Sequence, residues 1–210
     1  MTRVKICGIS STKDAKLACD AGADAIGLVF YPPSSRYVTK EQAAEIVASL
    51  PPFVTVVGLF VNASKHEIDD VLAQVSIDII QFHGDEDEPF CASFQRDYIK
   101  AIRMKDGLDL YALDKHYGSA RGLLLDTYKK GIPGGTGEVF NWDKVPHDLH
   151  LPIILAGGLV ADNVAQAIKQ VKPYAVDVSG GVEYSADSGV KVAKKGKDQQ
   201  KINQFMAQIR

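Results

Sequence analysis

The sequence has few cysteines, little net charge and no long apolar run. Its three cysteines form no CxxC pair, so neither a disulfide framework nor a zinc site is indicated, and reduced thiols in the cytoplasm are expected. A net charge of −2 argues against a nucleic-acid-binding protein. No segment approaches the ~20 apolar residues of a membrane span, and the start of the chain lacks the apolar core of a signal peptide. These absences indicate a globular protein with neither nucleic acid nor membrane as a partner.

Short apolar segments alternate with segments of helical spacing almost from end to end. The apolar segments fall at 4–7, 25–30, 54–61, 77–82, 98–104, 122–127, 152–156 and 175–178. They are continuously apolar, as expected for parallel strands that are buried on both faces. Eight such strands with helical returns predict a (β/α)8 TIM barrel, with residues 1–210 as a single catalytic domain. A doubly wound sheet with an appendage is the rival fold, but no change in composition marks a linker.

Helices are predicted between these strands, together with one irregular insert. The helical segments fall at 11–20, 40–50, 64–74, 86–96, 108–116, 162–171 and 198–209, with a short one at 141–145. Thr39 and Gln42 match a capping box, and Asp162 can cap the helix that follows it. The acidic run 85–88 is expected to face outward from a first helical turn. The insert 184–197, rich in Lys, Gly and Ser, is expected to be an exposed loop.

Two strand ends carry groups that are suited to proton transfer. Cys7 closes the first strand and Asp126 the sixth, and the carboxyl ends of barrel strands are where function resides. Taken alone, Cys7 is more often a packed apolar residue, and Asp126 can equally be a carboxylate bonded to turn amides. Facing one cavity, a thiolate and a carboxylic acid would form an acid/base pair, and we therefore expect no metal and no cofactor. Lys5 shares the strand face of Cys7 and is the first candidate cation for a thiolate.

Arg36 and His83 are candidates for binding. Arg36 follows two prolines and two serines, and its guanidinium group suits a carboxylate, although a solvated loop charge is the alternative. His83 ends the fourth strand, where a histidine is either functional or, more often, a hydrogen-bonded structural group.

Glycine clusters follow the last two strands, the place where barrels commonly bind phosphate. The candidate residues are Gly157, Gly158, Ser179, Gly180 and Gly181. Glycine lets backbone N–H groups approach phosphate oxygens, although glycines also simply make tight turns. A further cluster at 134–137 could add donors. No Walker or GxGxxG pattern accompanies these glycines, so a nucleotide is not favoured.

Ordered motifs along essentially the whole chain resemble the phosphoribosylanthranilate isomerase family of tryptophan biosynthesis. They lie at 4–9, 30–38, 57–62, 81–86, 125–127, 134–137, 155–159 and 177–183. So many motifs in one order are a highly specific signal. One departure is visible: the family usually has Ser-Ser-Gly where this chain has Ser179-Gly180-Gly181, which removes a hydroxyl but keeps the backbone N–H.

The resemblance implies an Amadori rearrangement of N-(5′-phosphoribosyl)anthranilate to 1-(2-carboxyphenylamino)-1-deoxyribulose 5-phosphate. It implies that Cys7 is the general base and Asp126 the general acid. It also places Arg36 on the anthranilate carboxylate, His83 in the substrate site and the two glycine loops on the phosphate.

Two other functions are weighed against this one. A metal-dependent phosphosugar isomerase would need histidines at several strand ends, and only His83 qualifies. A barrel that merely binds phosphosugars would not need both Cys7 and Asp126. The sequence leaves open whether the protein is a monomer or a homodimer and whether it also accepts a related aminoaldose of histidine biosynthesis.

Overall fold

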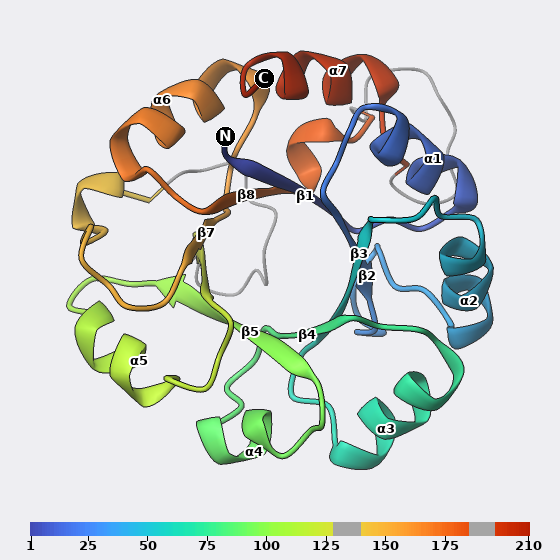
Figure 1. Cartoon of the computed structure of the whole chain (residues 1–210), viewed down its shortest axis with the longest axis horizontal. Coiled ribbons are helices and arrows are strands. Elements are labelled where there is room, and N and C mark those ends of the chain that lie inside the picture. The colour runs from blue at the N-terminus through green and yellow to red at the C-terminus, as the bar shows by residue number, and fades with distance from the viewer. Residues whose placement is uncertain (128–139, 185–195) are drawn as a thin grey trace.

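The computed structural model describes residues 1–127, 140–184 and 196–210. Its eight strands are all parallel and pair in sequence order into a closed barrel, with the helices around it (Figure 1). The strands are β1 (Arg3–Cys7), β2 (Ala25–Val29), β3 (Thr55–Phe60), β4 (Ile79–Phe82), β5 (Asp97–Met104), β6 (Leu123–Thr127), β7 (Ile153–Leu155) and β8 (Ala175–Val178). The predicted (β/α)8 barrel is therefore confirmed.

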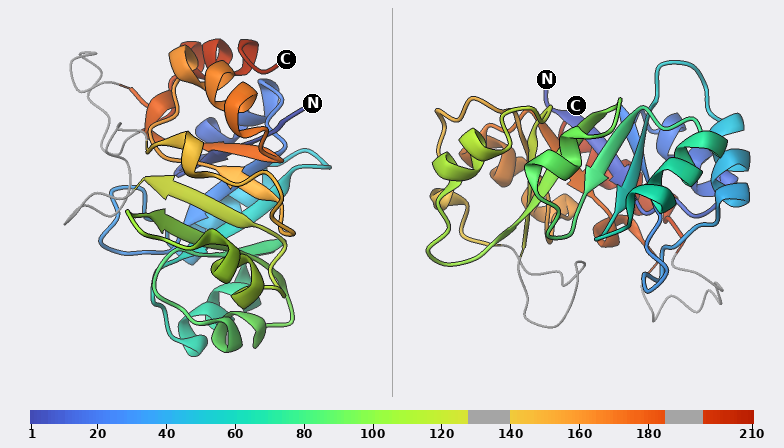
Figure 2. Two further views of the ribbon diagram at one scale, coloured as in Figure 1. Left: turned by 90° about the vertical axis from the view of Figure 1, so that its left-hand side faces the viewer. Right: turned by 90° about the horizontal axis from the view of Figure 1, so that it is seen from below.

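The helices return the chain from the carboxyl end of one strand to the start of the next. The α-helices are α1 (Thr12–Asp20), α2 (Lys40–Ala48), α3 (Lys65–Gln74), α4 (Glu88–Ala92), α5 (Leu110–His116), α6 (Ala161–Val171) and α7 (Gln199–Ala207), and the short 3₁₀ helices are η1 (Trp142–Lys144) and η2 (Gly180–Val182). Both termini lie at the end of the barrel where the strands begin (Figure 2). The loops that follow the strands are at the opposite end, where barrel enzymes place their sites.

Side chains of each strand alternate between two packed regions. In β1, Val4 and Ile6 belong to the large apolar cluster between the strands and the helices. Cys7, on the other face of β1, packs with Val29 and Leu59 inside the barrel. This alternation places every second residue of a strand toward the barrel interior, and it fixes which strand-end groups share the mouth.

The fourth helix is shorter than predicted. Instead of 86–96, α4 spans Glu88–Ala92, because the Asp87 side chain accepts the N–H of Phe90 and Pro89 occupies the first turn. Asp87 is thus the N-cap, and the chain leaves the helix at Ser93.

The starts of two other helices test the predicted caps. The capping box of Thr39 and Gln42 at α2 is confirmed. The predicted cap at Asp162 is wrong: α6 begins one residue earlier, and the Asn163 side chain accepts the N–H of the N-cap Val160 at 2.9 Å. Asp162 lies in the first turn, where its charge favours the helix dipole.

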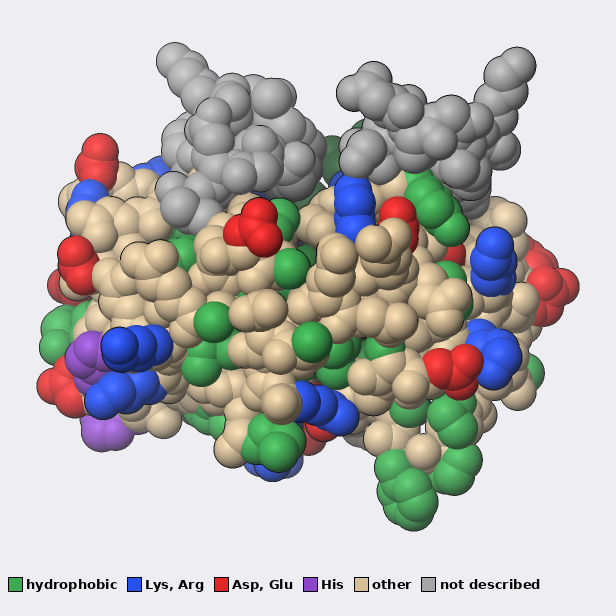
Figure 3. Space-filling model, turned by 90° about the horizontal axis from the view of Figure 1, so that it is seen from above, with side chains coloured by type: hydrophobic (Ala, Val, Ile, Leu, Met, Phe, Trp, Pro, Cys, Tyr) green, Lys and Arg blue, Asp and Glu red, His purple; other side chains and the backbone are tan. Residues whose placement is uncertain are grey.

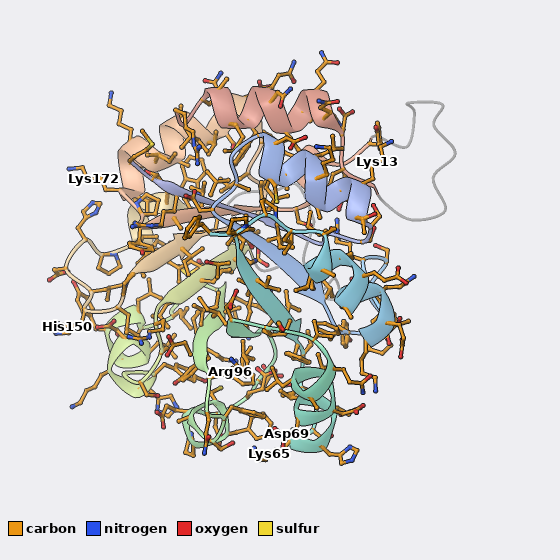
Figure 4. All side chains as sticks on the ribbon, turned by 45° about the vertical axis from the view of Figure 1, so that its right-hand side comes forward. Lys13, Lys65, Asp69, Arg96, His150 and Lys172 are labelled. Atoms are coloured by element: carbon orange, nitrogen blue, oxygen red, sulfur yellow. The ribbon has the colours of Figure 1, made fainter. Side chains whose placement is uncertain are left out.

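The surface is mixed in charge. On the face shown in Figure 3, basic and acidic side chains are interspersed with apolar ones. Lys65 and Asp69, which project from α3 in Figure 4, form an exposed ion pair with 3.4 Å between Nζ and Oδ2. Among the described residues, no helix has the length and apolar character needed to cross a bilayer.

Candidate active site

Cys7 lies at the barrel mouth with its sulphur against β2. The side chain is buried, and its register partner across the β1–β2 ladder is Gly27. A Cβ atom at Gly27 would lie only 2.7 Å from the Cys7 Sγ, so any larger residue at this position would displace the sulphur. Glycine in the middle of a strand is otherwise unfavourable. Its presence here is explained by the space that the thiol occupies.

A buried ion pair lies next to this thiol. Lys5, two residues before Cys7 on the same strand face, donates from Nζ to the Asp177 Oδ1 at 2.9 Å. Lys5 and Asp177 are register partners in the β1–β8 ladder, and both side chains are more than 90 % buried. Burial alone would lower the pKa of Lys5, but Asp177 and Cys7 hold it above its ordinary value, so the lysine is a cation.

Opposing influences act on the thiol itself. Burial is the largest and raises the pKa of Cys7, and the Asp177 carboxylate adds to the increase. Lys5 and Lys197 lower the pKa of Cys7, Lys5 the more strongly. The net direction is upward, so the cations offset part of the cost of forming a buried thiolate without removing it.

Asp126 lies at the end of β6, in hydrogen-bond contact with His83. Its Oδ2 is 3.2 Å from the His83 Nε2, and its Oδ1 accepts the N–H of Thr127 at 2.8 Å. The other imidazole nitrogen, Nδ1, is 2.9 Å from the amide nitrogen of Gln81. The Gln81 amide and the Asp126 carboxylate thus hold the two ring nitrogens of His83 from opposite sides. Both oxygens of Asp126 are therefore fixed in direction.

Arg36, in the loop after β2, reaches over the end of β1 to Glu183. Its Nε and Nη2 donate to the two carboxylate oxygens at 2.6 and 2.8 Å, a bidentate pair. Within the described parts of the chain, Nη1 has no hydrogen-bond partner. The Glu183 carboxylate thus orients the guanidinium group and leaves the Nη1 nitrogen available to a further acceptor.

The burial of Lys197 contradicts the prediction that this end of the insert 184–197 is exposed. Most of 184–197 lies outside the described residues, but Lys197 itself is 1 % exposed and its Nζ donates to the Glu183 Oε1 at 3.1 Å and to the Ser179 carbonyl at 3.1 Å. An antiparallel bridge joins Glu183 to Lys197. Burial lowers the pKa of Lys197, which Glu183 partly opposes. Glu183 consequently lies between two cations.

The glycine loops after β7 and β8 pack directly on each other and on the β6 end. Gly157 and Gly158 have φ of 81° and 67°, which favour glycine. A Cβ at Gly157 would lie 2.8 Å from the Asp126 Oδ1, and one at Gly181 would lie 2.0 Å from the carbonyl of Leu159. The structure therefore brings both loops to the edge of the mouth beside Asp126. The predicted cluster at 134–137 lies outside the described residues.

Within the acidic run 85–88, Asp85 and Asp87 are exposed as predicted, but Glu86 is not. Glu86 is buried and accepts hydrogen bonds from the N–H of Asn62 at 2.7 Å and of Gly84 at 2.9 Å. Its Oε2 also accepts from the Lys100 Nζ at 2.8 Å. Because α4 begins only after this residue, Glu86 is free to turn inward, and it fixes the loop that follows His83.

Two residues of the site, Gln81 and Lys197, were not predicted from the sequence. A signal existed for Gln81: it is a fully buried polar residue in an apolar strand, two positions before His83 and therefore on the same face. No comparable signal existed for Lys197, since its burial depends on the bridge to Glu183. Among the described residues, no three His, Cys, Asp or Glu side chains are grouped so as to hold a metal ion.

The sequence matches one family model over residues 4–208, that of N-(5′-phosphoribosyl)anthranilate isomerase. A relative of this name from Alcanivorax borkumensis is 62% identical over 181 residues, which cover 86% of this chain and 83% of that protein. Another, from Pseudomonas savastanoi pv. phaseolicola, is 56% identical over 207 residues, which cover 99% of this chain and 97% of that protein.

Solved structures agree with the sequence relatives. The phosphoribosylanthranilate isomerase of Thermotoga maritima superposes with a TM-score of 0.87 at 37% identity, covering 99% of this chain and 98% of that one. A second structure of such an isomerase, in complex with reduced 1-(o-carboxyphenylamino)-1-deoxyribulose 5-phosphate, gives a TM-score of 0.84 at 36% identity with the same coverage. On the family match, the identities and the shared barrel, this chain belongs to the phosphoribosylanthranilate isomerase family.

Proposed function

We propose that Cys7 and Asp126 are the general base and general acid of the reaction that defines the family, the isomerisation of N-(5′-phosphoribosyl)anthranilate in tryptophan biosynthesis. The observation that carries this assignment is the placement of both groups on inward-facing positions at the strand ends, one in β1 and one in β6. Each is held by its surroundings, Cys7 by the space at Gly27 and Asp126 by His83.

The first step is ring opening. Asp126 donates a proton to the furanose ring oxygen, the bond from that oxygen to C1′ breaks, and the nitrogen lone pair forms the C1′=N bond of a protonated Schiff base. The hydrogen bonds to His83 and Thr127 hold the carboxyl group in a fixed direction, as proton transfer requires.

The second step is proton removal at C2′. The Cys7 thiolate takes this proton, and the electron pair moves through the C1′=N bond to give an enolamine. The enolamine tautomerises to the ketone, so that no atom is gained or lost overall. The step needs no metal or cofactor.

The remaining mouth residues bind the two anionic ends of the substrate. Arg36, clamped by Glu183, offers Nη1 to the anthranilate carboxylate. The N–H groups of Gly157, Gly158, Gly180 and Gly181, with Ser179 beside them, take the phosphate. His83 faces the sugar from the same side as Asp126.

The setting of this reaction is proposed in the same way. Residues 1–210 act as one catalytic domain. A reactive thiol must stay reduced, which fits the cytoplasm. Another Thermotoga maritima structure is described as monomers generated from a dimeric isomerase. Size-exclusion chromatography distinguishes a monomer from a homodimer for this chain.

The test follows the loss of phosphoribosylanthranilate fluorescence in the presence of a chelator. The wild type is expected to be active, whereas Cys7→Ala and Asp126→Ala each lose at least about a thousandfold in kcat/KM while the barrel stays folded by circular dichroism. Cys19→Ala, a half-buried cysteine on α1, is the matched control and is expected to keep full activity. An inactive wild type, or full activity in either site variant, contradicts the assignment. Dependence on a metal would favour the other class of phosphosugar isomerase.

A further inference from the structure

The ion pair of Lys5 and Asp177 is an unusual occupant of a barrel interior. The residues of the interior cluster beside it are apolar, among them Val57, Ile99 and Leu124. Placing an ammonium and a carboxylate in such a region is costly, and a buried pair rarely stabilises more than apolar residues of the same size would. A pair that is kept there needs another explanation than stability.

The position of the pair supplies that explanation. Lys5 and Cys7 are two residues apart on one strand, so their side chains lie on the same face. The ladder between β1 and β8 brings Asp177 opposite Lys5, and their 2.9 Å bond fixes the ammonium below the thiol. Within the described residues, Asp177 is the only carboxylate bonded to Lys5, and Cys7 is its other polar neighbour.

Other charged groups face the thiol from the surrounding elements. Lys197 acts from the segment before α7 and Arg36 from the loop after β2. Both are bonded to the single carboxylate of Glu183, which offsets part of their charge. Lys5 therefore differs from them in lying on the strand of Cys7 itself, two residues away on the same face, and in lowering the pKa of the thiol more than Lys197 does.

We propose that Lys5, held in place by Asp177, is a positioning residue that stabilises the thiolate of Cys7 for proton abstraction. The proposal rests on the base role given to Cys7 above. Asp177 has two effects in this arrangement: it keeps Lys5 charged and in place, and it moderates the stabilisation because its own negative charge opposes a nearby thiolate.

This arrangement predicts opposite responses to two variants. In Lys5→Met/Asp177→Asn, both charges are removed and the stronger one, the cation, is lost, so the thiol ionises at a pH at least one unit higher. In Asp177→Asn, the carboxylate that opposes the thiolate is gone, while the thiolate itself still favours the Lys5 ammonium, so the thiol ionises at a lower pH. Lys5→Arg, which keeps the charge, is the matched control and is expected to stay within about half a unit of the wild type.

The probe is iodoacetamide, with mass spectrometry of the peptide that carries Cys7. The pH at half-maximal alkylation reports the ionisation of this thiol independently of how accessible it is, and the acid limb of kcat/KM against pH is measured in parallel. We expect both midpoints to move together, with a loss of at least tenfold in kcat/KM on the acid side for the double variant. If Lys5 and Asp177 had a merely structural role, the double variant and Asp177→Asn would not shift these midpoints in opposite directions.

The outcomes separate this proposal from the proposed function. Unchanged alkylation midpoints in folded variants overturn the role of Lys5, whatever the activity. A shifted alkylation midpoint with an unshifted kcat/KM profile overturns the base role of Cys7, and with it the use of the pair in catalysis.

A second measurement needs no charge-removing variant. The NMR signal of the Lys5 ε-carbon in the wild type is expected to shift with pH at the Cys7 midpoint, and Cys7→Ser is expected to abolish this step. A wild-type signal without the step overturns the proposal even if the double variant does not fold.

Discussion

Two buried lysine–carboxylate pairs occupy the two sides of the barrel wall. Lys5–Asp177 is inside the barrel beside Cys7, with side-chain exposures of 6 and 9 %. Lys100–Glu86 is outside it, with exposures of 3 % each, and its ammonium lies 5.7 Å from the centre of the Tyr117 ring beneath the helices. The two pairs are similarly buried, and their distances from the lysine Nζ to the carboxylate oxygen are 2.9 and 2.8 Å. Their partners are what differ.

The outer pair is surrounded by backbone groups. Lys100 donates to the Gly84 carbonyl at 2.8 Å, and Glu86 accepts the N–H groups of Gly84 and Asn62. The inner pair lies on the same strand face as a thiol, and within the described residues no backbone group is hydrogen-bonded to its side chains. The comparison shows that burial and ion pairing alone do not reveal a functional residue, because the same pair can hold a loop or act on a reactive group.

The largest change in stability is expected when the outer pair, Lys100–Glu86, is broken. Lys100→Met leaves the Glu86 carboxylate buried without its cation, and the free energy of unfolding is expected to fall by about 3–5 kcal/mol. Urea unfolding at pH 7 measures this change. The sharper test is Lys100→Met/Glu86→Gln, which should recover little, because one amide oxygen cannot accept every bond that the carboxylate accepts.

The matched control for that experiment is the inner pair. Lys5→Met/Asp177→Asn should unfold within about 1.5 kcal/mol of the wild type, since a buried pair removed as a unit costs little. Equal losses in the two double variants would contradict the distinction between a structural and a functional pair.

The next largest effect is expected on activity, when the sulphur of Cys7 beside the inner pair is displaced. Gly27→Ala places a methyl group 2.7 Å from the Cys7 sulphur, and the displaced thiol should lose about a hundredfold in kcat/KM, or about 2.7 kcal/mol. Steady-state kinetics of the purified variant measures it. Gly58→Ala in β3 is the control, because its methyl group would meet only side chains, no closer than 3.2 Å. A similar loss of activity in both variants would rule out a specific role for the space at Gly27.

A smaller effect concerns Glu183, a carboxylate with two cations instead of one. Burial alone would raise the pKa of Glu183, but Arg36 and Lys197 outweigh it and hold the pKa below its ordinary value. A lowered folded-state pKa stabilises the protein above the unfolded-state pKa, and this contribution is lost as the pH falls through the folded-state value. Glu183→Gln should therefore cost about 1–3 kcal/mol at pH 7. Unfolding curves at pH 7 and at successively lower pH test this, and a difference between variant and wild type that does not shrink as the pH falls would contradict it.

The smallest effect is expected for an ion pair without burial. Lys65 and Asp69 on α3 are each 53 % exposed, so solvent screens them. Asp69→Asn should change the free energy of unfolding by less than about 0.5 kcal/mol, and 1 M NaCl should leave the wild type and this variant indistinguishable. A larger loss would mean that exposure is a poor guide to the strength of pairs in this protein.

Local patterns predicted most of the fold because they depend on neighbouring residues. The apolar strands gave the barrel and its order, and the capping box at Thr39 positioned α2 within a residue. The predictions failed where a nearby competitor decided the outcome. Asp87 and Pro89 shortened α4, and Asn163 took the capping role expected of Asp162.

The site divides in the same way. The positions of Cys7 and Asp126 at strand ends follow from the sequence, as do the glycine loops after β7 and β8, and the roles of these residues stay predictions. The inward turn of Glu86 and the burial of Lys197 could not be foreseen, because each depends on partners from other elements.

What the sequence determined by itself is the barrel, its strand order and the polar groups that end its strands, since strand periodicity and turn chemistry are local properties. Only the tertiary structure decided which of these groups meet. The register of β1 against β8 sets Asp177 opposite Lys5, and the closure of the barrel sets Gly27 against the Cys7 sulphur. Hydrogen bonds and close ion pairs form only when the two groups lie within about 3–4 Å, so the contacts around the thiol depend on that register.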